Sequence, residues 1–228
     1  MLRSMQFLNP TFIIALLIAV SIHEWAHAFT ATKLGDPTPG DAGRLSLNPI
    51  AHLDLLGALL FLTVGFGWAK PVPVNPMYFR HPKRDTCLTA AAGPLSNLVL
   101  AFFSLLGLTL LGQRVGISPW ELVMFPARGE VLQAFFLQLL SSLLFINLGL
   151  MAFNLLPIAP LDGSKVLQAF VPLRYADQYE EFMRIGMYVL LALFLAESLL
   201  HIPLLSFWVV TIMEWVLMGM EAIIGAFL

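Results

Sequence analysis

Long apolar stretches constrain this chain more than any other feature of its sequence. A helix of about 20 apolar residues crosses the hydrocarbon core of a bilayer. Five stretches approach or exceed that length, at residues 9–32, 87–112, 131–157, 184–201 and 203–227. Hydrophobic residues make up 59% of the 228-residue chain and charged residues only 11%, whereas soluble domains carry about 25% charged residues. We therefore predict an all-α polytopic membrane protein with about five transmembrane helices.

The region between the first two spans has a different character. Its apolar run, residues 55–68, is short and interrupted by glycines, and the stretch from Gly67 to Pro76 is rich in proline and alternates in a way typical of extended backbone. We predict a short re-entrant or β-hairpin element here. No soluble stretch is long enough for a separate domain. We expect residues 1–228 to form a single membrane-embedded domain, with a core near residues 9–170 and accessory helices near residues 184–227.

The distribution of charge predicts an orientation and excludes one class of partner. The net charge of −2 leaves no basic surface of the kind that binds nucleic acid. Cytoplasmic loops of membrane proteins carry an excess of Lys and Arg. If the first span runs inward and residues 55–68 do not cross, residues 33–86 and 158–184 are cytoplasmic and hold nine of the twelve Lys and Arg. The short, domain-free form favours a prokaryotic inner membrane, and any active site near the inner ends of these spans would lie toward its cytoplasmic side.

The first apolar stretch contains the pentapeptide His23-Glu24-Trp25-Ala26-His27. Residues four apart share one face of a helix, so both imidazoles can bind one metal ion, with Glu24 beside them as a general base. Placing a cluster of ionisable side chains within the bilayer costs free energy, so such a cluster indicates a functional site. We interpret the pentapeptide as the centre of a metal-assisted hydrolysis; a buried polar cluster that bonds neighbouring helices is the alternative.

Two further polar residues lie at the same depth in other spans. Asp162 follows the third long span after helix-breaking prolines, and it can supply a third ligand, because a catalytic zinc usually takes three from the protein. Its alternative role is to cap a helix that begins just after it. Asn97, four residues after Gly93, can donate to a developing oxyanion or hold a substrate backbone. It can equally hydrogen-bond a neighbouring helix.

These residues taken together resemble the site-2 protease family of intramembrane zinc metalloproteases, peptidase family M50. The resemblance rests on four ordered motifs: His23-Glu24-x-x-His27, the Gly67–Pro76 stretch, Gly93-x-x-x-Asn97, and Asn154-x-x-Pro157 leading into Leu161-Asp162-Gly163. It covers most of residues 15–165. The chain has no stretch that resembles the PDZ or CBS regions of some family members.

The resemblance implies a zinc endopeptidase that binds one Zn²⁺ per chain. His23, His27 and Asp162 would be the metal ligands and Glu24 the general base. Asn97 matches a family asparagine assigned to contact with the substrate or the transition state. Zinc makes water a stronger acid and polarises a carbonyl, and Glu24 would carry the proton from the water to the leaving amine.

The resemblance also implies a class of substrate. The Gly67–Pro76 stretch is similar to the membrane-associated β-element that presents an extended substrate, and Val72 and Val74 would form its edge. The expected partners are single-span membrane proteins within the lipid bilayer, while the oligomeric state is left open. Two alternatives stay open: a zinc-binding membrane scaffold or transporter without hydrolytic activity, and an unrelated membrane peptidase with a third ligand other than Asp162.

Overall fold

The computed structural model describes residues 9–64, 67–115 and 131–227. Five of its helices are long and apolar enough to cross a membrane. They are α2 (Pro10–Lys33), α6 (Pro82–Val115), α8 (Val131–Asn154), α10 (Ala176–Leu200) and α11 (Leu204–Gly225). The predicted all-α class and the five predicted spans are confirmed. Helices α6 and α10 begin before residues 87 and 184 because their first turns carry charged residues, which a helix accepts but a search for apolar stretches leaves out.

Local sequence accounts for the bounds of α2, the helix that carries the histidine pair. Asn9 is the N-cap, and its side-chain oxygen accepts a hydrogen bond from the Thr11 N–H at 3.0 Å. Pro10 follows at the first helical position, where a missing N–H costs nothing. The helix ends at Lys33, and Gly35 then turns the chain with a φ of 107° that other residues rarely adopt.

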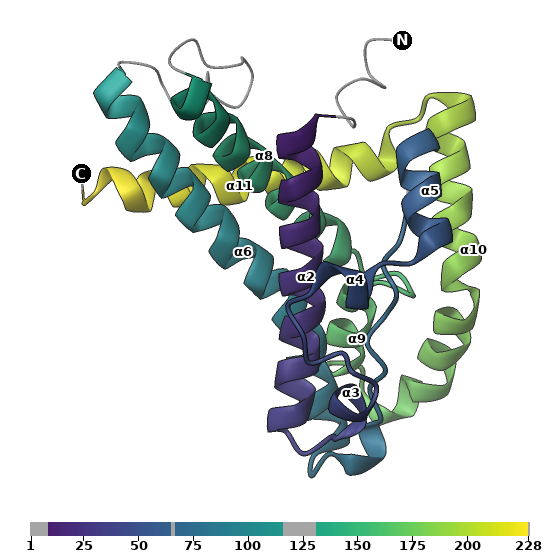
Figure 1. Cartoon of the computed structure of the whole chain (residues 1–228). Helices are drawn as coiled ribbons and strands as arrows, with labels where there is room; N and C mark the ends of the chain where they lie inside the picture. The colour runs from purple at the N-terminus through teal and green to yellow at the C-terminus, as the bar shows by residue number, and fades with distance from the viewer. Residues whose placement is uncertain (1–8, 65–66, 116–130, 228) are drawn as a thin grey trace.

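Helices α2, α6 and α8 form the packed core of the molecule (Figure 1). Leucines of α6 and α8, among them Leu105, Leu108, Leu144 and Leu148, are almost fully buried against one another. On the other side of α8, Ala15 and Ala19 of α2 pack against Ile146. Small residues at such a contact let two helix backbones approach closely. The core therefore holds three helices in fixed relation to one another.

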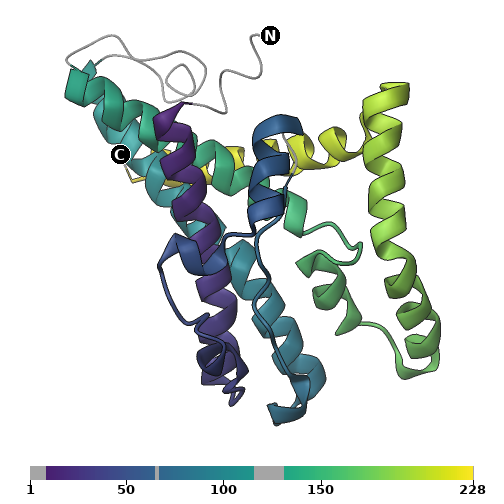
Figure 2. The same ribbon diagram turned by 45° about the vertical axis from the view of Figure 1, so that its right-hand side comes forward.

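The last two long helices are arranged differently. Helix α11 runs crosswise to α6 and packs against α8, while α10 stands apart from α2 and α6 (Figures 1 and 2). The turn between α10 and α11 is closed by Glu197, whose Oε2 accepts hydrogen bonds from the N–H groups of Leu205 and Ser206, both at 3.0 Å. Glu197 thus caps the start of α11 instead of lying free at the membrane surface.

Short elements occupy the connections. These are α3 (Thr38–Asp41), α4 (Pro49–His52), α5 (Leu55–Val64), η1 (Pro76–Tyr78), α9 (Asp162–Gln168) and η2 (Leu173–Tyr175). The predicted re-entrant or β-hairpin element is not confirmed: the run from residue 55 forms the helix α5, and the described residues contain a single antiparallel bridge, between Leu53 and Ala69. The segment after Ala69 stays extended up to Asn75 but builds no ladder, because two of its residues, Pro71 and Pro73, have no N–H group.

Candidate metal centre

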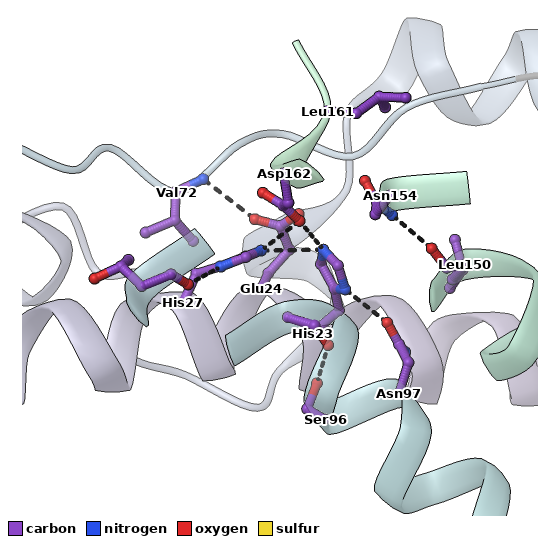
Figure 3. A network of polar contacts seen from close by, with 12 residues as sticks. His23, Glu24, His27, Val72, Ser96, Asn97, Leu150, Asn154, Leu161 and Asp162 are labelled. Atoms are coloured by element: carbon purple, nitrogen blue, oxygen red, sulfur yellow. Dashed lines mark hydrogen bonds and ion pairs between the residues drawn. The ribbon is translucent and has the colours of Figure 1, made fainter. Parts of the chain in front are cut away.

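His23, His27 and Asp162 meet in the core, although the last is separated from the other two by more than 130 residues. The two Nε2 atoms lie 3.1 Å apart, and each is 3.2 Å from Oδ2 of Asp162 (Figure 3). All three residues are buried. The structure therefore brings together the three residues that the sequence predicts as metal ligands.

Hydrogen bonds on the far side of each ring determine which nitrogen carries a hydrogen. His27 Nδ1 lies 2.7 Å from the backbone carbonyl of Thr89, and a carbonyl can only accept, so Nδ1 is the donor. His23 Nδ1 lies 2.6 Å from Oδ1 of Asn97 and donates in the same way. In the neutral rings both Nε2 atoms then present lone pairs to the centre, as a metal ligand must.

Three lone-pair atoms thus converge with no hydrogen among them. Oδ2 of Asp162 is buried and has no hydrogen-bond partner in the described part of the chain. Such a cluster is repulsive unless a cation lies at its centre. Ligands about 2.0–2.1 Å from a tetrahedral zinc ion are about 3.3 Å from one another, close to the separations of 3.1 and 3.2 Å seen here. The residues fit a zinc ion by both charge and geometry.

Gly93 of α6 forms the floor beneath the two imidazoles. A methyl group at this position would lie 2.6 Å from Cε1 of both His23 and His27, well inside van der Waals contact. Only glycine lets the α6 backbone approach the rings this closely. The close helix approach that Gly93 permits therefore lies at the candidate metal centre itself.

Asp162 is the first residue of α9, and Leu161 occupies the N-cap position without a side-chain capping bond. The carboxylate of Asp162 is therefore not used as a helix cap, which was the alternative prediction for this residue. Gly163 allows the start of α9 to lie against the end of α8, since a methyl group there would be 2.5 Å from the Leu155 carbonyl carbon and the Leu156 oxygen. The Asp-Gly pair combines a candidate ligand with a close backbone contact.

Glu24 is half-buried and follows His23 directly on α2. Its Oε2 accepts a hydrogen bond from the backbone N–H of Val72 at 3.2 Å, and Figure 3 shows its carboxylate beside Asp162. The segment predicted to present a substrate thus contacts the predicted base directly. Val72 and Val74 are half-buried between exposed prolines, and their contact with a substrate stays a prediction.

Asn97 lies behind His23, with no exposed surface. Its Oδ1 accepts from His23, and its Nδ2 donates to Oδ1 of Asn147 at 2.7 Å and, more weakly, to the Ala19 carbonyl at 3.4 Å. Because both ends of the amide are engaged within the protein, this geometry favours support of His23 over the predicted contact with a substrate. The sequence reasoning missed Asn147, whose only signal is an amide in an otherwise apolar stretch.

Comparisons with known proteins were consistent with this site. The sequence pattern of peptidase family M50 matches residues 113–196. YwhC of Bacillus subtilis (strain 168), whose name gives it provisionally as a zinc metalloprotease, is 40% identical over 187 residues, which are 82% of this chain and 81% of that protein. Rip2 of Mycobacterium tuberculosis (strain ATCC 25618 / H37Rv), provisionally named in the same way, is 29% identical over 204 residues, 87% of this chain and 70% of Rip2. No solved structure matches the chain.

Proposed function

The chain belongs to peptidase family M50 and is a zinc metalloprotease, and from that premise we propose that it hydrolyses peptide bonds within the membrane segments of single-span proteins. The observation that carries the proposal is the convergence of His23, His27 and Asp162 beside the carboxylate of Glu24. Three protein ligands leave one coordination position open, which distinguishes a catalytic zinc site from a structural one.

Each residue of the centre has a role in this proposal. His23, His27 and Asp162 hold the zinc ion, and Asn97 and the Thr89 carbonyl keep the two rings in the binding tautomer. A bound zinc ion supplies Lewis-acid chemistry, by polarising a carbonyl and making water a stronger acid. The aspartate contributes one negative charge to the ligand set, while both imidazoles are neutral.

Glu24 is the proton carrier. It accepts a proton as water attacks the scissile carbonyl and returns that proton to the leaving amine, so its charge is restored at the end of the cycle. The Val72 N–H holds Oε2 of the carboxylate. The other oxygen, Oε1, has no hydrogen-bond partner among the described residues and is available for proton transfer. The Val72 contact therefore orients the base.

The position of the centre in the fold supports an active site within the membrane and toward the cytoplasm. His23 lies thirteen residues after Pro10, or about 20 Å along α2. The end of α2 and the start of α6 lie at the lower end of the molecule in Figure 1, and α9 packs against α6. These segments carry Lys33, Lys83 and Lys165, and an excess of positive charge is typical of the cytoplasmic side.

A helical substrate must be locally unwound before it can be cut, since its amides are hydrogen-bonded within the helix. An extended peptide can be held by backbone hydrogen bonds to another extended segment. The segment around Val72 and Val74 runs past Glu24 without a ladder of its own. We therefore keep it as the surface that receives the unwound substrate.

The test is cleavage of single-span membrane reporters by the purified protein in zinc-containing detergent, compared with Glu24→Gln. We expect the parent to cut within the membrane segment of a reporter, with the position determined by mass spectrometry. The variant removes the base but keeps the shape and the metal ligands. Its cleavage rate should fall by about 10²- to 10⁴-fold, while both proteins bind one zinc ion per chain.

Three results would contradict the proposal. Equal fragments from the parent and the variant would trace the activity to a contaminant. Cuts confined to the soluble flanks of the reporters would contradict cleavage within the membrane. Zinc bound with full stoichiometry after Asp162→Ala would show that the third ligand lies elsewhere.

A further inference from the structure

A buried asparagine on α8, Asn147, stands at the end of a chain of side-chain amides that leads to the metal centre. It has no exposed surface, and the residues on either side of it in the sequence, Ile146 and Leu148, are buried as well. Its Nδ2 donates to the backbone carbonyl of Leu143 at 2.8 Å, and its Oδ1 accepts from Asn97 at 2.7 Å. Asn97 in turn accepts from His23 at 2.6 Å. Three helices are therefore joined by consecutive hydrogen bonds.

In this series of hydrogen bonds every donor and acceptor is fixed, and a backbone carbonyl fixes them. The Leu143 oxygen can only accept, so the group that faces it must be the NH₂ of Asn147. The oxygen of Asn147 then faces Asn97, which must present its own NH₂. This leaves the oxygen of Asn97 for His23 and makes Nδ1 of His23 the donor. The Ala19 carbonyl, 3.4 Å from Nδ2 of Asn97, favours the same orientation.

The reverse direction would be incompatible with metal binding. If Asn97 turned its NH₂ toward His23, Nδ1 would have to accept, and the hydrogen of the neutral ring would move to Nε2. That hydrogen would point at His27 and Asp162, whose nearest atoms are 3.1 and 3.2 Å from Nε2. It would occupy the place of the zinc ion.

We propose that Asn147 is a positioning residue for the metal centre: it orients the amide of Asn97, and through it selects the tautomer of His23 that binds zinc through Nε2. The inference rests on the proposed role of His23, His27 and Asp162 as metal ligands. Burial strengthens the effect, because an amide far from water cannot exchange a lost partner for solvent.

The experiment compares metal binding by full-length variants in detergent. Asn147→Leu keeps the approximate size of the side chain and removes both hydrogen bonds. Asn147→Asp in its protonated form can still donate to Leu143 and accept from Asn97, so it preserves the direction of the chain. Ser104→Ala is the matched control, because Ser104 is a buried residue of α6 whose hydroxyl donates to the Leu100 carbonyl at 2.7 Å, outside this chain of amides.

Zinc affinity is measured by competition with a chelator, and the ligand geometry by the visible spectrum of the cobalt-substituted protein. We expect Asn147→Leu to weaken zinc binding by about 10- to 100-fold and to alter the cobalt spectrum. Asn147→Asp and Ser104→Ala should retain the affinity and spectrum of the parent. A purely structural role for Asn147 would lower thermal stability and leave the cobalt spectrum unchanged.

Asp162→Ala separates failure of the inference from failure of the proposed site. If Asp162→Ala loses zinc while Asn147→Leu binds it as the parent does, the inference is overturned and the proposed site stands. If Asp162→Ala binds zinc normally, the proposed ligand set fails, and the inference fails with it. Should Asn147→Leu not fold, Asn147→Ala is compared with Leu148→Ala, which leaves a cavity at the adjacent buried position; equal zinc affinity in these two variants would overturn the inference.

Discussion

The proposed metal ligands come from two regions of the molecule that are built in opposite ways. His23 and His27 lie in the interior of a regular 24-residue helix, so their separation follows from the backbone itself. Asp162 begins a helix of only seven residues, after the irregular stretch 155–161. Nothing local determines its distance from the histidines. The two regions show that helix geometry can fix the spacing of two candidate ligands, while the position of the third depends on the segments that pack against it.

Helix α6 packs against α9, and part of the packing around the stretch before Asp162 comes from α10. A methyl group at Gly186 would lie 2.7 Å from Cβ and the carbonyl oxygen of Ala159, so the helix and the stretch before Asp162 are in direct backbone contact. One turn further on, Leu190 packs against Leu161, the residue just before the ligand. The hydroxyl of Tyr179 donates to the Ser164 carbonyl in the first turn of α9 at 2.5 Å. The helix predicted as an accessory therefore packs against the segments on both sides of Asp162, the proposed third ligand.

We expect the largest loss of zinc binding from a change at Gly93, which packs against the two histidines of the regular helix α2. Gly93→Ala would place a methyl group 2.6 Å from both imidazole rings, and neither ring can move without leaving its hydrogen bond to Asn97 or Thr89. We expect loss of stoichiometric zinc, measured by atomic absorption after dialysis, and loss of cleavage. Gly149→Ala on α8 is the control, since open space surrounds that position. Full zinc content in Gly93→Ala would contradict the close packing of α6 against the rings.

We expect a smaller loss of zinc binding from a change at Gly186, which packs against the irregular stretch before Asp162. Gly186→Ala would push α10 away from Ala159 and shift the stretch that carries Asp162. Overpacking of this kind costs about 1–3 kcal/mol, and we expect zinc affinity to fall by about 10-fold, within the range for residues that support a ligand. Chelator competition measures the change. Gly219→Ala on α11, which meets open space, should bind zinc as the parent does. If both variants behaved alike, α10 would have no part in placing Asp162.

The smallest effect is expected from Tyr179→Phe, which removes one hydrogen bond to the first turn of α9 and leaves the ring in place. A single such bond contributes about 1 kcal/mol to stability. We expect a small drop in the thermal unfolding midpoint of the zinc-free protein and a change in zinc affinity below that of Gly186→Ala. A larger loss of affinity in Tyr179→Phe than in Gly186→Ala would reverse this order and make the hydroxyl the main support of Asp162.

Much of this arrangement could be predicted because it depends on local physics. The spans follow from hydropathy, since an apolar helix is the stable form of an apolar segment in lipid. The facing of His23 and His27 follows from the period of the helix. Asp162 was predicted from the need for a third ligand and from a motif, with a helix cap as the alternative, and the structure brings it to the histidines.

Other features could not be predicted because they depend on contacts between distant segments. The proline-rich stretch was expected to belong to a re-entrant or β-hairpin element. An extended backbone needs a partner with free N–H groups before it becomes a strand, and here the Val72 N–H meets a side chain, Glu24, instead. The role of Asn97 changes with its neighbour Asn147, fifty residues away. The importance of Gly186 follows from one contact with Ala159.

The sequence by itself determined which residues can bind a metal and which segments can cross a membrane, because both depend on side-chain chemistry and on the regular period of a helix. The tertiary structure alone decided how the amides of Asn97 and Asn147 are oriented and what holds Asp162 in place. Hydrogen-bond direction and close backbone contact are properties of pairs of segments. They come into being only when α2, α6, α8 and α10 are packed together.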